Sequence, residues 1–99
     1  MRPVNIAATA SRELAEAVRW YETKRPGLGG EFYDAVVEAI ALLQQRPGVG
    51  RQVDGPPPYR QMLVERFPYH VVYRERPADL YVVAVAHTKR RPEYWKARK

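Results

Sequence analysis

The chain has 99 residues, of which 45% are hydrophobic and 28% are charged, as in a single soluble domain with one core. It contains no cysteine, which excludes a disulfide framework, thiolate chemistry and a zinc–thiolate site. No apolar run reaches the length of a transmembrane helix, and the N-terminal residues lack the apolar segment of a secretory signal. We therefore expect a cytoplasmic protein with no membrane association, formed by one domain over residues 1–99.

The formal net charge of +6 is concentrated at the C-terminus. Residues 89–99 hold six basic residues and one acid, Glu93, so five of the six net positive charges lie in this segment. A localised basic patch favours a negatively charged partner, such as nucleic acid or an acidic protein surface. Charge runs are also common in solvated tails. Residues 88–99 are therefore expected to form a basic C-terminal tail, which either binds a negatively charged partner or is a solvated extension.

The N-terminal half predicts a short strand followed by two amphipathic helices. Residues 3–7 alternate in the manner of a strand, and residues 9–25 then show helical spacing, with Thr9 or Ser11 as the N-cap. Pro26 and Gly27 end the first helix and turn the chain into a second one, which ends before Pro47. The apolar stripes are Leu14, Ala17, Val18 and Tyr21 on the first helix, and Leu28, Phe32, Ala35, Val36, Ala39, Ile40 and Leu43 on the second.

The C-terminal half predicts a loop and then three strands. Residues 48–59 read as a loop because they are rich in glycine and contain three consecutive prolines. Strands follow over residues 59–67, 68–75 and 80–87. Residues 80–86 are apolar at every position, which is typical of a strand buried on both faces, so we place this strand at the centre of the sheet.

The order of these elements predicts an α+β domain with two layers. A short N-terminal strand is followed by an α-helical hairpin and then by a three-stranded antiparallel meander, in the order β-α-α-β-β-β. The hairpin has to bury its apolar stripes, and the sheet is the surface that the sequence offers for this.

Basic residues follow the point where the last predicted strand emerges from the core. His87 lies at that point, where it can exchange a proton near neutral pH or simply bond a loop carbonyl. Lys89, Arg90 and Arg91 come next and can bind phosphate or carboxylate groups. Together they indicate a binding or catalytic rim at this end of the sheet.

Two aromatic residues and two further arginines extend this hypothesis. Tyr94 and Trp95 can stack on a nucleic-acid base or pin the tail to the sheet. Arg60 and Arg66 lie on or beside the neighbouring predicted strand, where they can join the rim or pair with nearby glutamates. A rim of His, Arg and Tyr has the groups needed to cleave RNA without a metal.

Other chemistries receive little support from the sequence. There is no nucleotide-binding glycine loop after a strand. Residues 27–30 precede a helix and could in principle hold a phosphate, but they follow a helix, so a turn explains them better. Two histidines without cysteines argue against a metal site. We expect no cofactor and no metal.

Two long motifs resemble those of the RelE/ParE superfamily of bacterial toxins from type II toxin–antitoxin modules, a group that includes plasmid stabilisation proteins. They are ELAEAVRWYETKRPGLGGEFYDAV and RFPYHVVYRERPADLYVVAVAHTKRRPEYW, and the similarity spans nearly the whole chain. The resemblance implies the fold predicted above. It also implies a growth-arresting toxin that is neutralised by a cognate antitoxin protein.

The resemblance leaves two targets, because ParE-like toxins poison DNA gyrase and RelE-like toxins cleave mRNA on the translating ribosome. Tyr94 falls about where RelE-like nucleases have a tyrosine, but His70 stands where an arginine is usual, and residues 48–59 lack the expected lysine pair. The RFPY and AVAH motifs are closer to the ParE side, so gyrase is the expected target.

Three hypotheses therefore follow from the resemblance. The first is a ParE-like gyrase poison. The second is a ribosome-dependent, metal-independent endoribonuclease with His87 or Tyr94 as general acid or base, and with Arg66 and Arg90 to stabilise charge on the phosphate. The third is an attenuated, non-enzymatic module that only binds its antitoxin. An amphipathic, acidic antitoxin segment would then bind the apolar helix stripe and the basic sheet face, at individual residues that the sequence leaves unknown. The residues expected at the functional rim are Arg66, His87, Arg90, Tyr94 and Trp95, with Arg60, Lys89 and Arg91 as further basic contacts.

Overall fold

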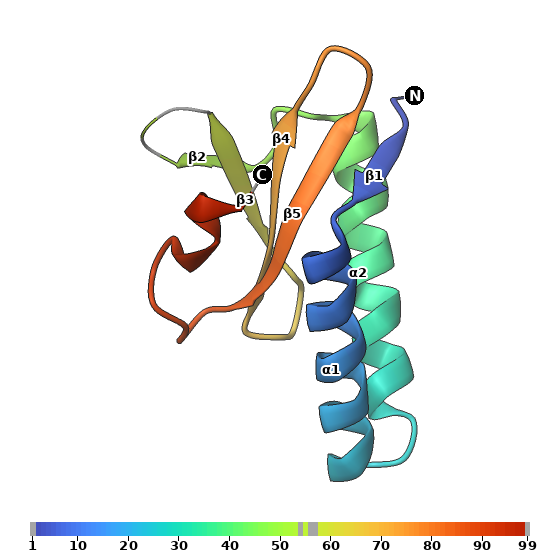
Figure 1. Ribbon diagram of the computed structural model, residues 1–99. Helices are drawn as coiled ribbons and strands as arrows, with labels where there is room; N and C mark the ends of the chain where they lie inside the picture. The colour runs from blue at the N-terminus through green and yellow to red at the C-terminus, as the bar shows by residue number, and fades with distance from the viewer. Residues whose placement is uncertain (1, 54, 56–57, 99) are drawn as a thin grey trace.

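The computed structural model describes residues 2–53, 55 and 58–98, which form an α+β domain (Figure 1). Lys99 of the basic tail and two of the three consecutive prolines, Pro56 and Pro57, lie outside the described residues. The elements are β1 (Val4–Ile6), α1 (Ala8–Lys24), α2 (Leu28–Gln45), β2 (Arg51–Val53), β3 (Tyr59–Leu63), β4 (Tyr69–Glu75), β5 (Leu80–His87) and the short 3-10 helix η1 (Tyr94–Ala97). The predicted α+β class, with a first strand, a helical hairpin and an antiparallel meander, is confirmed.

The helices follow the predicted stripes, but the first helix begins earlier than expected. Ala7 occupies the N-cap of α1 in extended conformation, and no side chain caps the helix. The prediction that Thr9 or Ser11 caps it is therefore wrong, since both residues lie inside α1. Among the described residues, neither helix has the length and apolarity that crossing a membrane would require.

A carboxylate on α1 holds the turn between the two helices. Glu22 accepts hydrogen bonds from the backbone N–H of Gly27 (2.9 Å) and of Gly29 (3.0 Å), so it satisfies donors at the start of α2. Gly27 has φ 90°, a left-handed conformation that favours glycine. The turn interpretation of residues 27–30 is thus supported, because a side chain of the protein takes the place that a phosphate would occupy.

The sheet has five strands in the order β1-β5-β4-β3-β2. β1 pairs with β5 in parallel, and the other neighbours are antiparallel. Three details differ from the prediction. β3 ends at Leu63, although residues 59–67 were predicted as a strand. Residues 51–53 form an edge strand within the segment predicted as a loop, and β4 rather than β5 is the middle strand, with β5 between β1 and β4.

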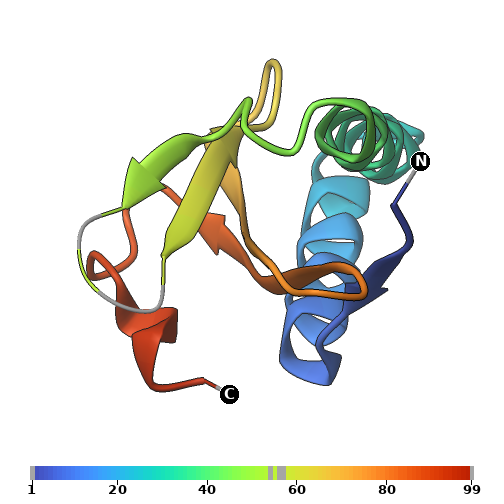
Figure 2. The same ribbon diagram turned by 90° about the horizontal axis from the view of Figure 1, so that it is seen from above.

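Both faces of the sheet are covered, as the apolar run in β5 requires. The helical hairpin packs on one face, where Phe32 and Val36 of α2 join Val82 and Val85 of β5 in the larger core cluster. On the opposite face a smaller cluster contains Val72, Val83, Ala84, Ala86 and Trp95. Figure 2 shows the helices on one side and the C-terminal segment on the other. The tail is therefore a third layer rather than a solvated extension.

A prediction tests the close contact between the two helices. A Cβ atom at Gly29 would lie 2.5 Å from the carbonyl oxygen of Val18, whereas a Cβ at Gly30 would meet nothing within 4 Å. Gly29→Ala should therefore lower the free energy of unfolding by about 1–3 kcal/mol. Gly30→Ala, the matched control, should leave it unchanged or raise it by up to about 1 kcal/mol. Urea unfolding followed by circular dichroism measures both, and equal effects would contradict the predicted close approach.

Candidate functional site

The C-terminal tail leaves β5 at His87 and folds back across the sheet (Figure 1). The backbone N–H of Thr88 donates to the Pro68 carbonyl (2.8 Å), and that of Arg90 donates to the His87 carbonyl (3.0 Å), which turns the chain. η1 then brings Tyr94 and Trp95 back toward β3 and β5. The tail is thus fixed at both its start and its end.

Trp95 is the apolar anchor of the tail. Its side chain is 2% exposed, and its ring meets that of Tyr59 on β3 edge-to-face, with 4.8 Å between centroids. Because Trp95 lies in the core cluster on the second face of the sheet, it is not an exposed stacking platform. Of the two roles considered for this residue, the structure favours the anchor.

Tyr94 links the tail to helix α1. Its hydroxyl donates a hydrogen bond to the Glu13 carboxylate, and the Arg90 guanidinium lies 4.0 Å from the centroid of its ring. Burial, together with the hydrogen bond to Glu13, raises the pKa of Tyr94 to about 12. Tyr94 therefore keeps its proton near neutral pH, and this favours a structural role over that of a general base.

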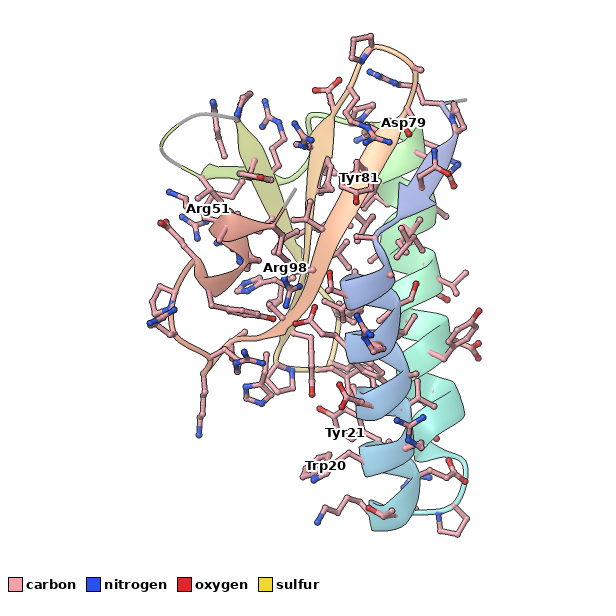
Figure 3. The ribbon with its side chains drawn as sticks, viewed as in Figure 1. Trp20, Tyr21, Arg51, Asp79, Tyr81 and Arg98 are labelled. Carbon is pink, nitrogen blue, oxygen red and sulfur yellow. The ribbon has the colours of Figure 1, made fainter. Side chains whose placement is uncertain are left out.

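The tail and the sheet together enclose a hollow of about 370 Å³. Three arginines line it, Arg51 from β2 and Arg90 and Arg91 from the tail. One acid, Glu93, also lines it, and this carboxylate pairs with Lys96 at 2.8 Å. Figure 3 shows Arg51 beside the tail at the β2 side of the molecule. The remaining lining residues are Gln52, Val53, Gln61, His70, Ala86, His87, Thr88, Pro92, Tyr94 and Trp95.

Two histidines lie in this hollow in different environments. Nδ1 of His87 accepts a hydrogen bond from the backbone N–H of Lys89 (3.0 Å), so the neutral ring carries its proton on Nε2. The His87 ring also packs edge-to-face on Tyr69, with 5.0 Å between centroids. Burial, and then the nearby Arg51 charge, lowers the pKa of His70, which is neutral at physiological pH.

This geometry suits the binding of anions more clearly than it suits proton transfer. Arginine side chains from two separate parts of the chain surround the hollow and can bind carboxylate or phosphate oxygens in pairs. Because Nδ1 of His87 accepts from Lys89, its Nε2 is the ring nitrogen that can donate, and Tyr94 already donates to Glu13. Among the side chains that line the hollow, His70 is the histidine whose lowered pKa suits a base.

The hollow brings together five of the eight residues expected at the rim: His87, Arg90, Arg91, Tyr94 and Trp95. Arg60 instead donates to the backbone carbonyls of Gly48 (3.3 Å) and Gly50 (2.9 Å) before β2. Lys89 is exposed and does not line the hollow. Arg60 and Lys89 are therefore adjacent in sequence to residues that line the hollow, but they do not line it themselves.

Arg66 also lies apart from the others. It occupies the turn between β3 and β4 with φ 74°, and its guanidinium pairs with Glu31 of α2 at 2.9 Å. Glu31 in addition pairs with Arg25 at 3.0 Å. Arg66 therefore connects the β3–β4 turn to the helical hairpin, which explains its distance from the rim on which it was expected.

Sequence reasoning missed several residues that shape the site. Arg51 was assigned to a loop, and His70 was noted only as a departure from a family pattern. Glu13 was not considered, although its position carried a signal. It lies three residues after Ala10 and four before Ala17, both buried, so it is a charge on the buried stripe of α1 and needs a partner there.

A metal centre has no support in the residues that the structure describes. Across residues 2–53, 55 and 58–98, no three His, Cys, Asp or Glu side chains come together in a way that would hold a metal ion.

A comparison with known protein families identifies the family to which this chain belongs. Residues 4–92 match the family described as the ParE toxin of the type II toxin–antitoxin system parDE. The chain belongs to the ParE toxin family. The match includes both helices, all five strands and the first residues of the tail, and the RelE/ParE resemblance seen in the two long motifs is confirmed on the ParE side.

A solved structure shows the same fold. The chain is similar to one in the chromosomal ParDE toxin–antitoxin system from P. aeruginosa, with a TM-score of 0.80 and 21% sequence identity. The similarity covers 90% of this chain and 98% of the other. No sequence among the curated proteins matches this chain. As a member of the ParE family, the protein is the toxin component of a type II toxin–antitoxin module.

The raised pKa of Tyr94 gives a prediction for alkaline solution. Because this pKa is about 12 in the folded protein, against about 10 for an ordinary tyrosine, Tyr94 stabilises the fold below pH 10 and this contribution is lost as pH rises toward 12. Tyr94→Phe should therefore flatten the alkaline loss of stability. Urea midpoints of the wild type and Tyr94→Phe, compared at several alkaline pH values, measure the effect.

The wild type and Tyr94→Phe also allow the pKa of Tyr94 to be measured directly. The difference in tyrosinate absorbance between them during an alkaline titration should have its midpoint well above 10. A midpoint at the ordinary tyrosine value would contradict the burial of Tyr94 together with its contact to Glu13.

Proposed function

We propose that this ParE-family toxin arrests growth by acting on DNA gyrase, and that the basic hollow under the C-terminal tail is the surface that acts. The observation that carries the proposal is the family match over residues 4–92. The expected functional residues are His87, Arg90 and Arg91 at the hollow, positioned by Tyr94 and Trp95. Arg51 joins them from β2.

The electrostatics of the hollow support this assignment. Arg51, Arg90 and Arg91 converge on one surface, where they favour an acidic protein surface or a nucleic-acid backbone. Binding such a partner requires no general base. A gyrase poison needs a surface that holds its target, and the arginines of the hollow can hold an acidic one.

A cognate antitoxin is the second partner. The P. aeruginosa structure with which this chain shares its fold is of a ParDE toxin–antitoxin system. We propose that an antitoxin binds this single-domain toxin in the cytoplasm and blocks the hollow, either by covering it or by moving the tail.

One specific observation supports the endoribonuclease hypothesis. Both histidines of the chain line the same hollow, with His70 neutral and His87 presenting Nε2 as a donor. A base and an acid of this kind could cleave RNA beside arginines that stabilise charge on the phosphate. Where the sequence predicted His87 or Tyr94 as general acid or base, this alternative takes His70 as the base and His87 as the acid, and it predicts mRNA cut within codons during translation.

Charge reversal at the hollow tests the proposed surface. Arg90→Glu with Arg91→Glu should abolish growth arrest, because the two arginines lose their attraction for an anionic partner and repel it instead. Arg12→Glu with Arg19→Glu is the matched control, since both residues are exposed on α1 and the net charge changes equally. Colony counts after induction without antitoxin measure arrest. A folded, fully toxic tail variant would contradict the assignment.

The order in which DNA synthesis and protein synthesis stop distinguishes gyrase from the ribosome as the target. After induction without antitoxin, incorporation of labelled precursors into DNA should fall before incorporation into protein, and transcripts should remain intact. Supercoiling by purified gyrase should then be inhibited by the toxin. Protein synthesis failing first, with cut transcripts, would favour the endoribonuclease. A well-folded protein that causes no arrest would favour the attenuated, antitoxin-binding module.

A further inference from the structure

The edge of β5 loses its strand partner halfway along its length. β1 pairs with Leu80, Tyr81 and Val82, and the backbone N–H of Ala7 then donates to the Val82 carbonyl (2.9 Å) as the chain enters α1. Among the described residues, no strand continues beside β5 on this side after Val82. The next backbone groups of β5 therefore need other hydrogen-bond partners.

Two side chains provide these partners. Nη1 of Arg98 donates to the Val83 carbonyl (3.0 Å), and Oε1 of Glu13 accepts a hydrogen bond from the Val85 N–H (3.0 Å). A neighbouring strand would offer one donor and one acceptor to the same two groups. Glu13 and Arg98 thus complete the edge of β5 in place of peptide groups.

The two side chains also bind each other through two parallel contacts. Nη1 of Arg98 lies 2.9 Å from Oε1 of Glu13, and Nη2 lies 3.0 Å from Oε2. Their side chains are 23% and 14% exposed, so this two-contact ion pair is largely shielded from water. Figure 3 shows Arg98 reaching from the tail toward β5 and α1. We name the Glu13–Arg98 pair, with its contacts to Val83 and Val85, the edge clamp.

We propose that Glu13 is the positioning residue of the toxin's tail: through the edge clamp and Tyr94 it sets where Arg90 stands in the basic hollow. Glu13 holds the Tyr94 hydroxyl on one side, and Arg90 stacks on the Tyr94 ring on the other. Arg98, at the end of η1, is held by the same carboxylate. The inference rests on the proposed function only in treating Arg90 as part of the acting surface.

Unlike a simple ion pair, the edge clamp requires the acid at position 13 and the base at position 98. Position 13 has to accept from the Val85 N–H, and position 98 has to donate to the Val83 carbonyl. A glutamate at 98 and an arginine at 13 would restore opposite charges but would place a donor against an N–H and an acceptor against a carbonyl. Exchange of the two charges is therefore expected to fail as a rescue.

Trp95 offers a spectroscopic readout of tail position. The chain has two tryptophans, and Trp20 is 54% exposed, so Trp20→Phe leaves buried Trp95 as the single reporter. In this background Glu13→Gln should shift the Trp95 emission to longer wavelength and raise the quencher-accessible fraction at least about tenfold, because removing one member of a shielded pair leaves an unpaired charge. Glu16→Gln, an exposed position on the same helix, should behave as the parent protein.

Arrest and fold are measured on the same variants. With far-UV circular dichroism unchanged, Glu13→Gln should lose growth arrest and Glu16→Gln should keep it. If Glu13→Gln does not fold, Arg98→Met removes the clamp from the tail side without altering α1 and should give the same emission shift. Unchanged Trp95 emission in folded Glu13→Gln or Arg98→Met would overturn the proposal.

Three further outcomes test separate parts of the inference. Recovery of the Trp95 emission in Glu13→Arg with Arg98→Glu would overturn the strand-like role of the clamp, whereas no recovery supports it. If the wild type causes no arrest, the proposed function fails while the emission shift still decides whether Glu13 holds the tail. A shift in emission with full arrest would overturn the link between the clamp and the acting surface.

Discussion

The structure depends on one constraint, which is that β5 is apolar toward both faces of the sheet. Val82 and Val85 lie against the helical hairpin, while Ala84 and Ala86 lie in the cluster on the opposite face. Burial of both faces removes apolar surface from water, and the described residues hold no second pair of helices to cover the outer face. The C-terminal tail covers it instead. The fold of the tail is thus a consequence of the composition of β5, and the basic hollow is a consequence of the fold of the tail.

The same constraint divides the charges of the tail into two groups. Lys96 pairs with Glu93, and Arg98 pairs with Glu13, so these cations are engaged within the domain. Lys89, Arg90 and Arg91 have no carboxylate partner among the described residues. A count of charges along the sequence therefore overstates the field that a partner meets. The three arginines at the hollow, one of them from β2, describe that field better.

Most of the fold could be predicted because its signals are local. The stripes of the two helices, the turn at Gly27 and the uniform apolarity of β5 lie within short segments, and each appears in the structure as expected. β2 could not be predicted in this way. It has three residues at the edge of the sheet, of which only Val53 is buried, and the segments on both sides of it are rich in glycine and proline.

The site was only partly predictable, because its geometry comes from contacts between distant parts of the chain. His87, Arg90 and Arg91 were expected near one another since they are close in sequence. That Trp95 would pack on Tyr59, or that Arg66 would pair with Glu31, depends on where the tail and the β3–β4 turn come to rest. Local patterns contain no information on either. Glu13 is intermediate: a charge on a buried stripe signals a partner, but not which one.

The edge clamp shows how one interaction can serve both the stability of the sheet and the shape of a surface. An open strand edge exposes backbone groups that invite pairing with other chains, and charged side chains are a common protection. Here one of the two protecting charges, Arg98, belongs to the tail, so the Val83 carbonyl at the edge of β5 is covered only when Arg98 is in place. Because the same tail carries Arg90 and Arg91 to the hollow, the edge and the hollow are complete in the same conformation. A partner that moved the tail would therefore expose the Val83 carbonyl at the edge and dismantle the hollow together.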